Sequence, residues 1–501
     1  MTRIDTLAQR IASGPRPGAM EDACPALSIH LLDTVGAWIA GRASPEGAQL
    51  HQLKDAGAKV PAVFGACVLD SIALATATAR LTEVDDMHMA SCTTPGAVVI
   101  LTALALAADV VSGPGGAIDG GLLAASIHTG YEVMTCLGEA LSGPEILHNG
   151  IWPTLLLAPV TSAAVASKLL GLDAERTANA LAIALTASNG RPGGSASAGV
   201  AAGPGTSARW LLLGMAARAG CAAALSAARG FSGDRTLLDG TPLAALHGIA
   251  LPPQALESFL RQGSAVQRTS IKPYCAAKHN IAAIHAFQQM LDQGIEHANL
   301  TRIRVKLPPA HARMVGHHDT ETSRLSRITS CAYNIALAGV SPQHLLDIQR
   351  QEPVRSADMS RLAHKVEVVA DEQLQSLTPQ AYPATVELFI GEKMVACKTV
   401  VDAWGDPKLP FDMAATRSKF RRLAEESVDE SVAAKVETLC SDLFDRATAL
   451  RALWGVLADI DRAHREKPIS TVPIGPLAQL RPAASPHPDP VQLKLNTRSE
   501  T

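Results

Sequence analysis

The chain has 501 residues, of which 47% are hydrophobic and 18% are charged, and its formal net charge is −3. This length favours two domains, and the apolar fraction suits a large core and excludes a disordered chain. So small a charge gives no electrostatic argument for binding nucleic acid or an anionic membrane. Because Ala and Leu abound while aromatic residues make up only 3%, we expect a mostly helical protein.

The nine cysteines are spread from Cys24 to Cys440 and include no CxxC pair. This pattern favours free, mostly buried thiols in a reducing cytosol over a disulfide framework or a thiolate zinc site. The first residues, MTRIDTLAQRIASG, lack an apolar signal core, and the longest apolar run, 97–108, is too short to cross a bilayer. We therefore expect a cytoplasmic protein that does not enter a membrane.

In chain order, the first part shows the apolar periodicity of helices. This periodicity predicts helices over 28–42, 159–171 and 206–230. Gly41 is the expected end of the first helix, and Asp173 is the expected N-cap of another that ends before Gly190. These helices are too apolar for the surface, so we expect them to pack together in a bundle-like core.

Near residue 265 the pattern changes to the alternation of strands. The expected strands are RIRVKL (302–307), HKVEVVAD (364–371), PATVELFI (383–390) and MVACKTVV (394–401). The last two flank Gly391, Glu392 and Lys393 and predict a hairpin. After GDPKLP the helical pattern returns, from 412 to 466, which indicates that the α/β part is inserted into the helical part.

Together these patterns predict a mainly α protein, in which a large all-helical domain carries an inserted, smaller α/β lid domain. The predicted parts are a helical domain (1–267), an α/β lid (268–404), a return to the helical domain (405–466) and a flexible Pro-rich tail (467–501).

Several segments, in order over about residues 5–465, together resemble the MmgE/PrpD family. They are DTVGAWIAG (33–41), EVDD (83–86), TTPGAVVILTALALA (93–107), GYEVMTCLGEAL (130–141), GIWPT (150–154), IKPYCAAKH (271–279), CAYNIALAGV (331–340) and GDPKLPFD (405–412). The family includes 2-methylcitrate dehydratase, cis-aconitate decarboxylase and iminodisuccinate epimerase. The resemblance implies an all-helical domain with a small α/β lid, a homodimer, and proton abstraction next to a carboxylate without a metal or an organic cofactor.

The resemblance also implies site residues. Glu83, Asp85 and Asp86 resemble the family's acidic stretch, Lys272 matches its lid lysine, and Tyr333 matches a tyrosine near the lid. Cationic side chains in such a site would hold substrate carboxylates and stabilise enolate-like charge.

Four positions depart from the family's pattern. Thr94 and Trp152 stand where the family usually has histidines, Arg209 replaces a lysine, and a further histidine corresponds to Ile281. Trp152 offers one N–H donor and a large apolar face, and Arg209 keeps its charge but cannot easily lose a proton. The site should therefore still hold an anion while being more apolar, which favours a bulkier or less carboxylated substrate.

Two histidines are candidates to replace the missing bases. His88 lies three residues after Asp85, and His148 lies four residues before Trp152. The alternative is that both are ordinary surface or satisfied histidines. In the same way, the acidic cluster is either part of the site or the N-terminal face of a helix.

Around the expected domain junction, Lys272 is either an anion-binding residue or a solvated lysine, and Lys278 and His279 lie close by. Cys275 has no readable base partner, so packing is its expected role. His311, His317, His318, Asp319 and Glu321 fit no standard metal-ligand spacing. The Gly/Ser-rich run 189–205 matches neither a phosphate loop nor a dinucleotide fingerprint and is expected to be a mobile loop near the cleft.

The sequence thus predicts a lyase-type enzyme, a dehydratase or decarboxylase, that acts on a small carboxylic acid by α-proton abstraction without a metal or cofactor. The catalytic candidates are Asp85, His88, Lys272 and Tyr333, and the substrate-binding candidates are Glu83, Asp86, Thr94, His148, Trp152, Arg209 and Lys278. The alternatives are an isomerase, epimerase or specialised biosynthetic enzyme on the same scaffold, and a non-catalytic protein that binds a small molecule. The expected partners are a carboxylate substrate and a second copy of the chain, without nucleic acid or membrane.

Overall fold

The computed structural model describes residues 1–466 except 17, 57–66, 114, 193–206, 240–247, 250, 252–263, 319–323 and 350–355. The predicted tail (467–501) and most of the Gly/Ser-rich run lie outside the described residues. Residues 1–466 form one compact unit.

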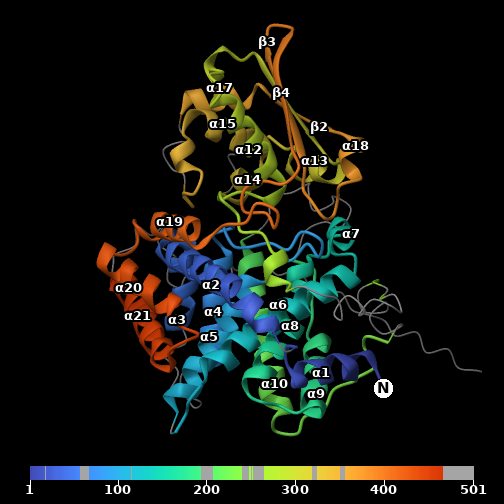
Figure 1. Ribbon diagram of the computed structural model, residues 1–501, viewed down its shortest axis with the longest axis vertical. Helices are drawn as coiled ribbons and strands as arrows, with labels where there is room; N and C mark the ends of the chain where they lie inside the picture. The colour runs from blue at the N-terminus through green and yellow to red at the C-terminus, as the bar shows by residue number, and fades with distance from the viewer. Residues whose placement is uncertain are drawn as a thin grey trace, which may run out of the picture. The chain divides into compact units, whose positions relative to one another are not determined.

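Helices make up the larger part of this unit (Figure 1). They are α1 (Arg3–Ser13), α2 (Ala19–Ala43), α3 (Pro45–Ala56), α4 (Val68–Arg80), α5 (Gly96–Ser112), α6 (Gly120–Ala140), α7 (Gly143–His148), α8 (Pro153–Leu169), α9 (Ala174–Thr186), α10 (Ala208–Ala227), α19 (Met413–Ala424), α20 (Glu430–Ser441) and α21 (Ala447–Glu466). The last three return to the first: α19 packs on α2, and α21 packs on α5. Residues far apart in sequence therefore share one helical core.

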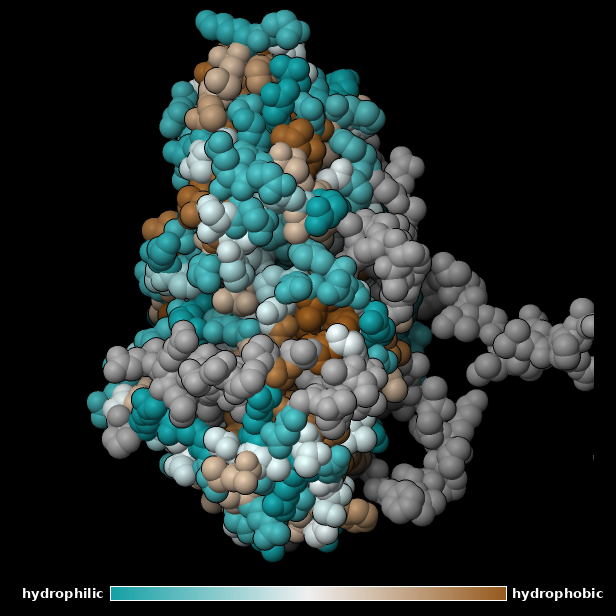
Figure 2. Space-filling model, turned by 90° about the vertical axis from the view of Figure 1, so that its right-hand side faces the viewer, coloured by the Kyte–Doolittle hydropathy of each residue, from teal (hydrophilic) through white to brown (hydrophobic). Residues whose placement is uncertain are grey.

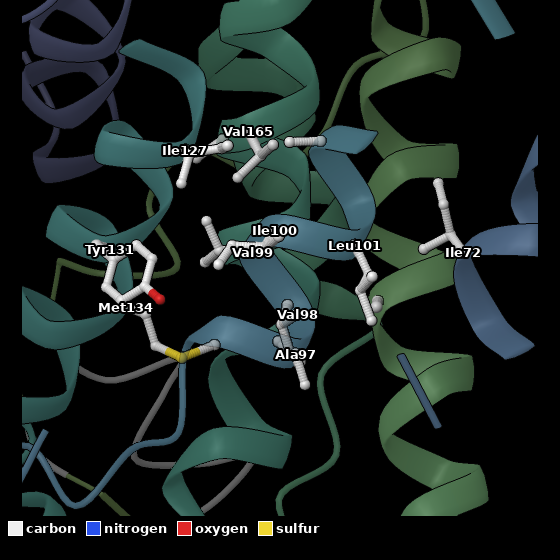
Figure 3. Packing of buried hydrophobic residues seen from close by; sticks show 14 of the residues in the cluster. Ile72, Ala97, Val98, Val99, Ile100, Leu101, Ile127, Tyr131, Met134 and Val165 are labelled. Atoms are coloured by element: carbon white, nitrogen blue, oxygen red, sulfur yellow. The ribbon is translucent and has the colours of Figure 1, made fainter. Parts of the chain in front are cut away.

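The centre of that core is α5, which is apolar all round and has almost every residue buried. Figure 3 shows Val99 and Ile100 of α5 near Ile127 and Tyr131 of α6, with Val165 of α8 beside them. Gly130 on α6 lets these helices approach, because a Cβ there would lie 2.5 Å from a methyl group of Val165. Small residues thus permit the close packing that the composition predicts.

The smaller part is a four-stranded mixed sheet in the order β2-β1-β3-β4. Its strands are β1 (Arg302–Leu307), β2 (Val366–Ala370), β3 (Ala384–Ile390) and β4 (Lys393–Val400), and its helices are α12 (Lys278–Leu291), α13 (Pro309–Val315), α14 (Arg324–Thr329), α15 (Cys331–Val340), α17 (Ala357–Ala363) and α18 (Glu372–Gln375). β1 pairs with β2 in parallel and with β3 in antiparallel fashion. Ile303, Val305 and Leu307 of β1 are fully buried on the face packed against helices.

The mainly α fold with a small α/β part confirms the predicted fold class. The four expected strands and the hairpin are present, although Lys393 opens β4 rather than belonging to the turn. Asp173 caps α9 as expected, accepting a hydrogen bond from Arg176 N at 2.8 Å. The domain boundaries stay predictions.

Gly41 was wrongly expected to end a helix. α2 runs through it to Ala43, and a Cβ at Gly41 would lie 2.1 Å from the carbonyl oxygen of Thr78. Gly41 is therefore a contact point between α2 and α4 rather than a helix stop. The helix that Asp173 caps, α9, ends at Thr186, before Gly190.

By length and composition alone, α2 and α10 could each cross a membrane, which the sequence reading did not anticipate. In α2, 67% of the most apolar stretch is buried inside the protein, and in α10 the share is 50%. Core helices of a soluble protein pass the same test. On the face drawn in Figure 2, hydrophilic residues predominate and apolar residues form scattered areas.

Candidate active site

The acidic cluster lies in the loop between α4 and α5, and Asp86 fixes the shape of that loop. Its Oδ1 accepts a hydrogen bond from Gly96 N at 2.9 Å, and its Oδ2 accepts from the Tyr131 hydroxyl at 2.6 Å and lies 2.8 Å from His30 Nδ1. Burial raises the pKa of Asp86, but the bonds from His30 and Tyr131 outweigh burial and leave it lowered. Asp86 is a buried anchor and is not among the residues that line the cavity described below.

Glu83 is held in a strained backbone conformation, with a φ of 60°. Its Oε2 lies 2.7 Å from Arg80 Nη1, and its Oε1 accepts a hydrogen bond from Trp210 Nε1 at 3.1 Å. Although burial raises the pKa of Glu83, the charges of Arg80, Arg209 and Lys272 lower it to about 2. Glu83 is therefore a fixed negative charge.

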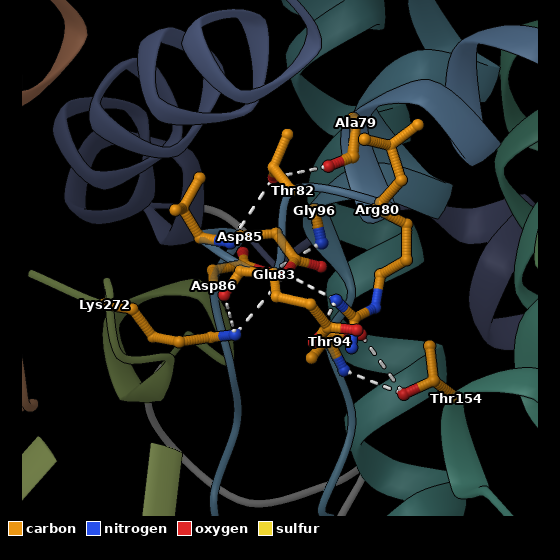
Figure 4. Close-up of polar contacts among 12 residues, drawn as sticks. Ala79, Arg80, Thr82, Glu83, Asp85, Asp86, Thr94, Gly96, Thr154 and Lys272 are labelled. Atoms are coloured by element: carbon orange, nitrogen blue, oxygen red, sulfur yellow. Dashed lines mark hydrogen bonds and ion pairs between the residues drawn. The ribbon is translucent and has the colours of Figure 1, made fainter. Parts of the chain in front are cut away.

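Asp85 and Lys272 form a second buried pair (Figure 4). Lys272 Nζ donates to the carbonyl oxygen of Glu83 at 2.7 Å and lies 3.5 Å from Asp85 Oδ1, which is 3.0 Å from Arg80 Nη1. Burial raises the pKa of Asp85 to about 6, against the charges of Arg80 and Lys272, and burial also lowers the pKa of Lys272. The two pKa values are shifted toward each other, which suits proton transfer near neutral pH.

A cavity of about 100 Å³ opens beside these residues. It is lined by Arg80, Glu83, Met87, Cys92, Thr94, Leu147, Gly150, Trp152, Pro192, Arg209, Lys272, Ala277, Lys278, His279, Met314, Leu325 and Thr329. Three long helices begin at this wall: Trp152 is the N-cap of α8, Arg209 is in the first turn of α10, and Lys278 opens α12. Their dipoles add to the cationic side chains, so the cavity favours an anion.

Trp152 is almost fully buried, and its ring contacts two guanidinium groups. The Cζ atoms of Arg209 and Arg80 are 4.5 and 5.3 Å from the centre of its ring. Both distances are within cation–π range, so the ring holds two like charges at one wall. Arg209 Nε has no hydrogen-bond partner among the described residues, and burial lowers the Arg209 pKa. Because Arg80 is engaged by Glu83 and Asp85, Arg209 is the better placed of the two to bind a ligand.

His279 is a site residue that the sequence reading did not select. It lies in the first turn of α12, lines the cavity, and packs its ring 4.5 Å from that of His311 and 4.8 Å from that of Tyr382. Burial, with nearby His311, lowers the pKa of His279 well below its ordinary value, so the imidazole is neutral. The resemblance placed a family histidine at Ile281 instead. Ile281 is not a cavity residue, because it is fully buried in the apolar cluster beneath the sheet. The signal that could have found His279 is its place one residue after the start of α12, at the end of the segment IKPYCAAKH.

Arg80 was also missed. It ends the apolar helix α4, where an arginine needs buried partners, and three residues later Glu83 supplies one. That spacing was readable, but the contact with Trp152 depends on the tertiary fold.

Of the remaining candidate site residues, some line the same cavity, one lines a second cavity, and two line neither. Thr94 and Lys278 line the cavity; Thr94 N donates to Thr154 Oγ1 at 3.1 Å, and Lys278 forms an ion pair with Asp406. His148 is exposed and lines a separate cavity of about 540 Å³. Neither cavity lining includes His88 or Tyr333.

His88 and Tyr333 have other neighbours. His88 Nδ1 lies 2.9 Å from Ser91 Oγ, and burial lowers its pKa to about 3. Tyr333 is on α15, in the apolar cluster that packs under the sheet. Their catalytic roles stay predictions, because neither side chain lines this cavity.

Two further sequence predictions concern the role of Cys275 and a possible metal site. Cys275 is buried, and its thiol lies 3.1 Å from the carbonyl oxygen of Thr82, which fits the expected packing role. Within the described ranges, no three His, Cys, Asp or Glu side chains gather as metal ligands. His317 lies 3.0 Å from Thr329 Oγ1, while Asp319 and Glu321 are outside the described residues.

Comparison with known proteins decides the family. The MmgE/PrpD N-terminal domain matches residues 5–245, and the MmgE/PrpD C-terminal domain matches residues 274–443. The chain belongs to the MmgE/PrpD family. It is also similar to two sequences of cis-aconitate decarboxylase from Aspergillus terreus; each is 26% identical over 396 residues, which cover 75% of this chain and 79% of the relative. Membership of the MmgE/PrpD family and this relative support, in broad terms, an enzyme of the lyase type.

Proposed function

We propose that this MmgE/PrpD protein is a lyase that removes carbon dioxide or water from a small di- or tricarboxylate by proton transfer, without a metal or organic cofactor. One observation carries the proposal: a single buried cavity brings together Arg209, Lys272 and His279. The name of the Aspergillus relative, a cis-aconitate decarboxylase, supports the same substrate class.

Binding follows from the charges at the cavity. Arg80, Arg209 and Lys272 outnumber the carboxylates Glu83 and Asp85. A substrate carboxylate loses its hydrogen bonds to water on entering the cavity. Arg209, Lys272 and the first-turn N–H groups of three helices would replace those bonds. The same groups would stabilise negative charge that develops on the substrate in the transition state.

Proton transfer follows from the protonation states. Neutral His279 would accept a proton, and the Lys272 ammonium, beside Asp85, would donate one. In a dehydration, the α-proton moves to His279, the C–H electron pair forms the double bond, and the departing hydroxide takes a proton from Lys272. In a decarboxylation, the C–C bond to the leaving carbon dioxide breaks and leaves its electron pair on the substrate carbon. That pair takes the proton of Lys272 and forms a new C–H bond.

Two alternatives remain distinct from this proposal. An isomerase or epimerase would return the proton to the same or a neighbouring carbon without losing a group. A non-catalytic binding protein would hold the ligand unchanged; the acidic and basic residues that face one cavity count against that alternative. Location in the cytosol and assembly as a homodimer belong to the same proposal.

The test is to incubate the full-length protein in deuterated water with cis-aconitate and a panel of other di- and tricarboxylates, and to follow products and carbon-bound deuterium by NMR. We expect loss of carbon dioxide with deuterium at carbon, or loss of water without it, abolished in Lys272→Ala and kept in the control Lys408→Ala, whose side chain is 73% exposed. Deuterium exchange without group loss would instead establish the isomerase. Binding with neither would refute an enzymatic function.

A further inference from the structure

Arg324 ties a wall of the cavity to the helical part. It is the first residue of α14, whose Leu325 and Thr329 line the cavity. Its Nε donates to Glu46 Oε1 of α3 at 2.8 Å, and its Nη2 donates to the carbonyl oxygen of Leu81 at 2.7 Å. One side chain thus joins α14 to two separate segments of the helical part.

The same guanidinium also covers a tryptophan of the site. Arg324 Cζ lies 4.8 Å from the centre of the Trp210 ring, and Trp210 Nε1 donates to Glu83 Oε1. Leu81, Trp210 and Leu325 form a small apolar cluster of their own under this contact. Because Arg324 is 93% buried, these contacts are made away from solvent, where charge-assisted bonds are strongest.

We infer that Arg324 is a positioning residue: it holds α14 closed over the cavity and braces Trp210, so that the Glu83 carboxylate stays turned toward Arg80. Arg324 does not line the cavity, so it acts through Leu325 and Trp210 rather than by touching substrate. Loss of Arg324 should therefore affect substrate binding. If Glu83 moved, Arg80 would lose its partner and would compete for the substrate anion, and the cavity wall formed by α14 would be held less firmly.

Lysine cannot replace this arginine. A lysine ammonium could reach Glu46 or the Leu81 carbonyl, but it lacks the planar fork that bonds both while stacking on Trp210. Burial raises the pKa of Glu46, yet the charge of Arg324 leaves it lowered, which shows that the pair is electrostatically engaged. Glu46→Gln removes that charge and leaves the Leu81 and Trp210 contacts.

The experiment compares Arg324→Lys, Glu46→Gln and a matched control, Arg302→Lys, in the full-length protein. Arg302 also stacks on an aromatic ring, with Cζ 4.2 Å from the centre of Phe389, but it lies on β1. Hydrogen–deuterium exchange should become faster at 324–329 in Arg324→Lys, less so in Glu46→Gln, and not in the control. KM for cis-aconitate should rise about tenfold with kcat within about threefold.

The two measurements separate two kinds of failure. The kinetic part rests on the proposed function, so a wild-type protein inactive on cis-aconitate would count against that function and leave the exchange measurement to decide on Arg324. Unchanged exchange at 324–329 in both Arg324→Lys and Glu46→Gln would overturn the positioning role. So would a fall in kcat at constant KM, because it would show direct participation in the chemistry. If Arg324→Lys fails to fold, Glu46→Gln carries the test.

Discussion

Asp86 offers a direct test of how the acidic loop is held. Replacing it with asparagine keeps the shape and one acceptor oxygen, which can stay bonded to Gly96 N. The amide group then faces the Tyr131 hydroxyl and His30 Nδ1, so two hydrogen bonds to a charged group are lost. Each such bond contributes about 1.5–3 kcal/mol, and the tyrosine hydroxyl can turn to accept from the amide. We therefore expect the free energy of unfolding to fall by about 3–4 kcal/mol.

Urea denaturation followed by circular dichroism measures this change. The control is Asp70→Asn, whose side chain is 62% exposed beside Arg218 and should change stability by less than about 0.5 kcal/mol. Tyr131→Phe should cost about 1.5–3 kcal/mol alone and far less in the Asp86→Asn background, because the shared bond is already gone. A loss below about 1 kcal/mol in Asp86→Asn, or full additivity with Tyr131→Phe, would refute the anchoring role.

Three further predictions follow from the same structure. His279→Gln should lower kcat at least about 100-fold with little change in melting temperature, measured by product NMR and thermal denaturation; an unchanged kcat would remove His279 from proton transfer. Because the folded-state pKa of Asp85 is raised to about 6, its protonated form contributes stability that is fully present below about pH 4 and is lost as pH rises through 6. Asp85→Asn should abolish that part of the pH dependence in urea titrations, and an unaltered profile would contradict the raised pKa. Gly41→Ala should cost about 1–3 kcal/mol, because its Cβ would meet Thr78 O at 2.1 Å, whereas Gly455→Ala, with open space around it, should be neutral or stabilising by thermal denaturation.

The sequence predicted the strands well because alternation is a local signal. The residues of β1 alternate between buried and half-buried, and its three apolar side chains are those that the pattern selected. The Asp173 cap was equally local, since the carboxylate bonds an N–H only three residues away. Helix ends set by tertiary contact were harder: Gly41 looked like a stop and is a point of close approach to α4.

For the site, the sequence selected Glu83, Lys272, Trp152 and Arg209, and the structure places all four at one cavity. It assigned Asp85 to catalysis and Asp86 to substrate binding, but it could not show that Asp86 is a buried anchor, because only the fold brings His30 and Tyr131 to Asp86 and Lys272 to Asp85.

The sequence by itself determined the mainly α class, the inserted sheet and the resemblance to the MmgE/PrpD family, since periodicity and ordered motifs are read along the chain. The tertiary structure alone decided which histidine faces the cavity. His279 and Ile281 are two residues apart on α12, so they project from different sides of the helix; one meets the cavity and the other meets the apolar cluster under the sheet. Which side is which depends on how α12 packs, and that is settled by contacts with residues far away in the sequence.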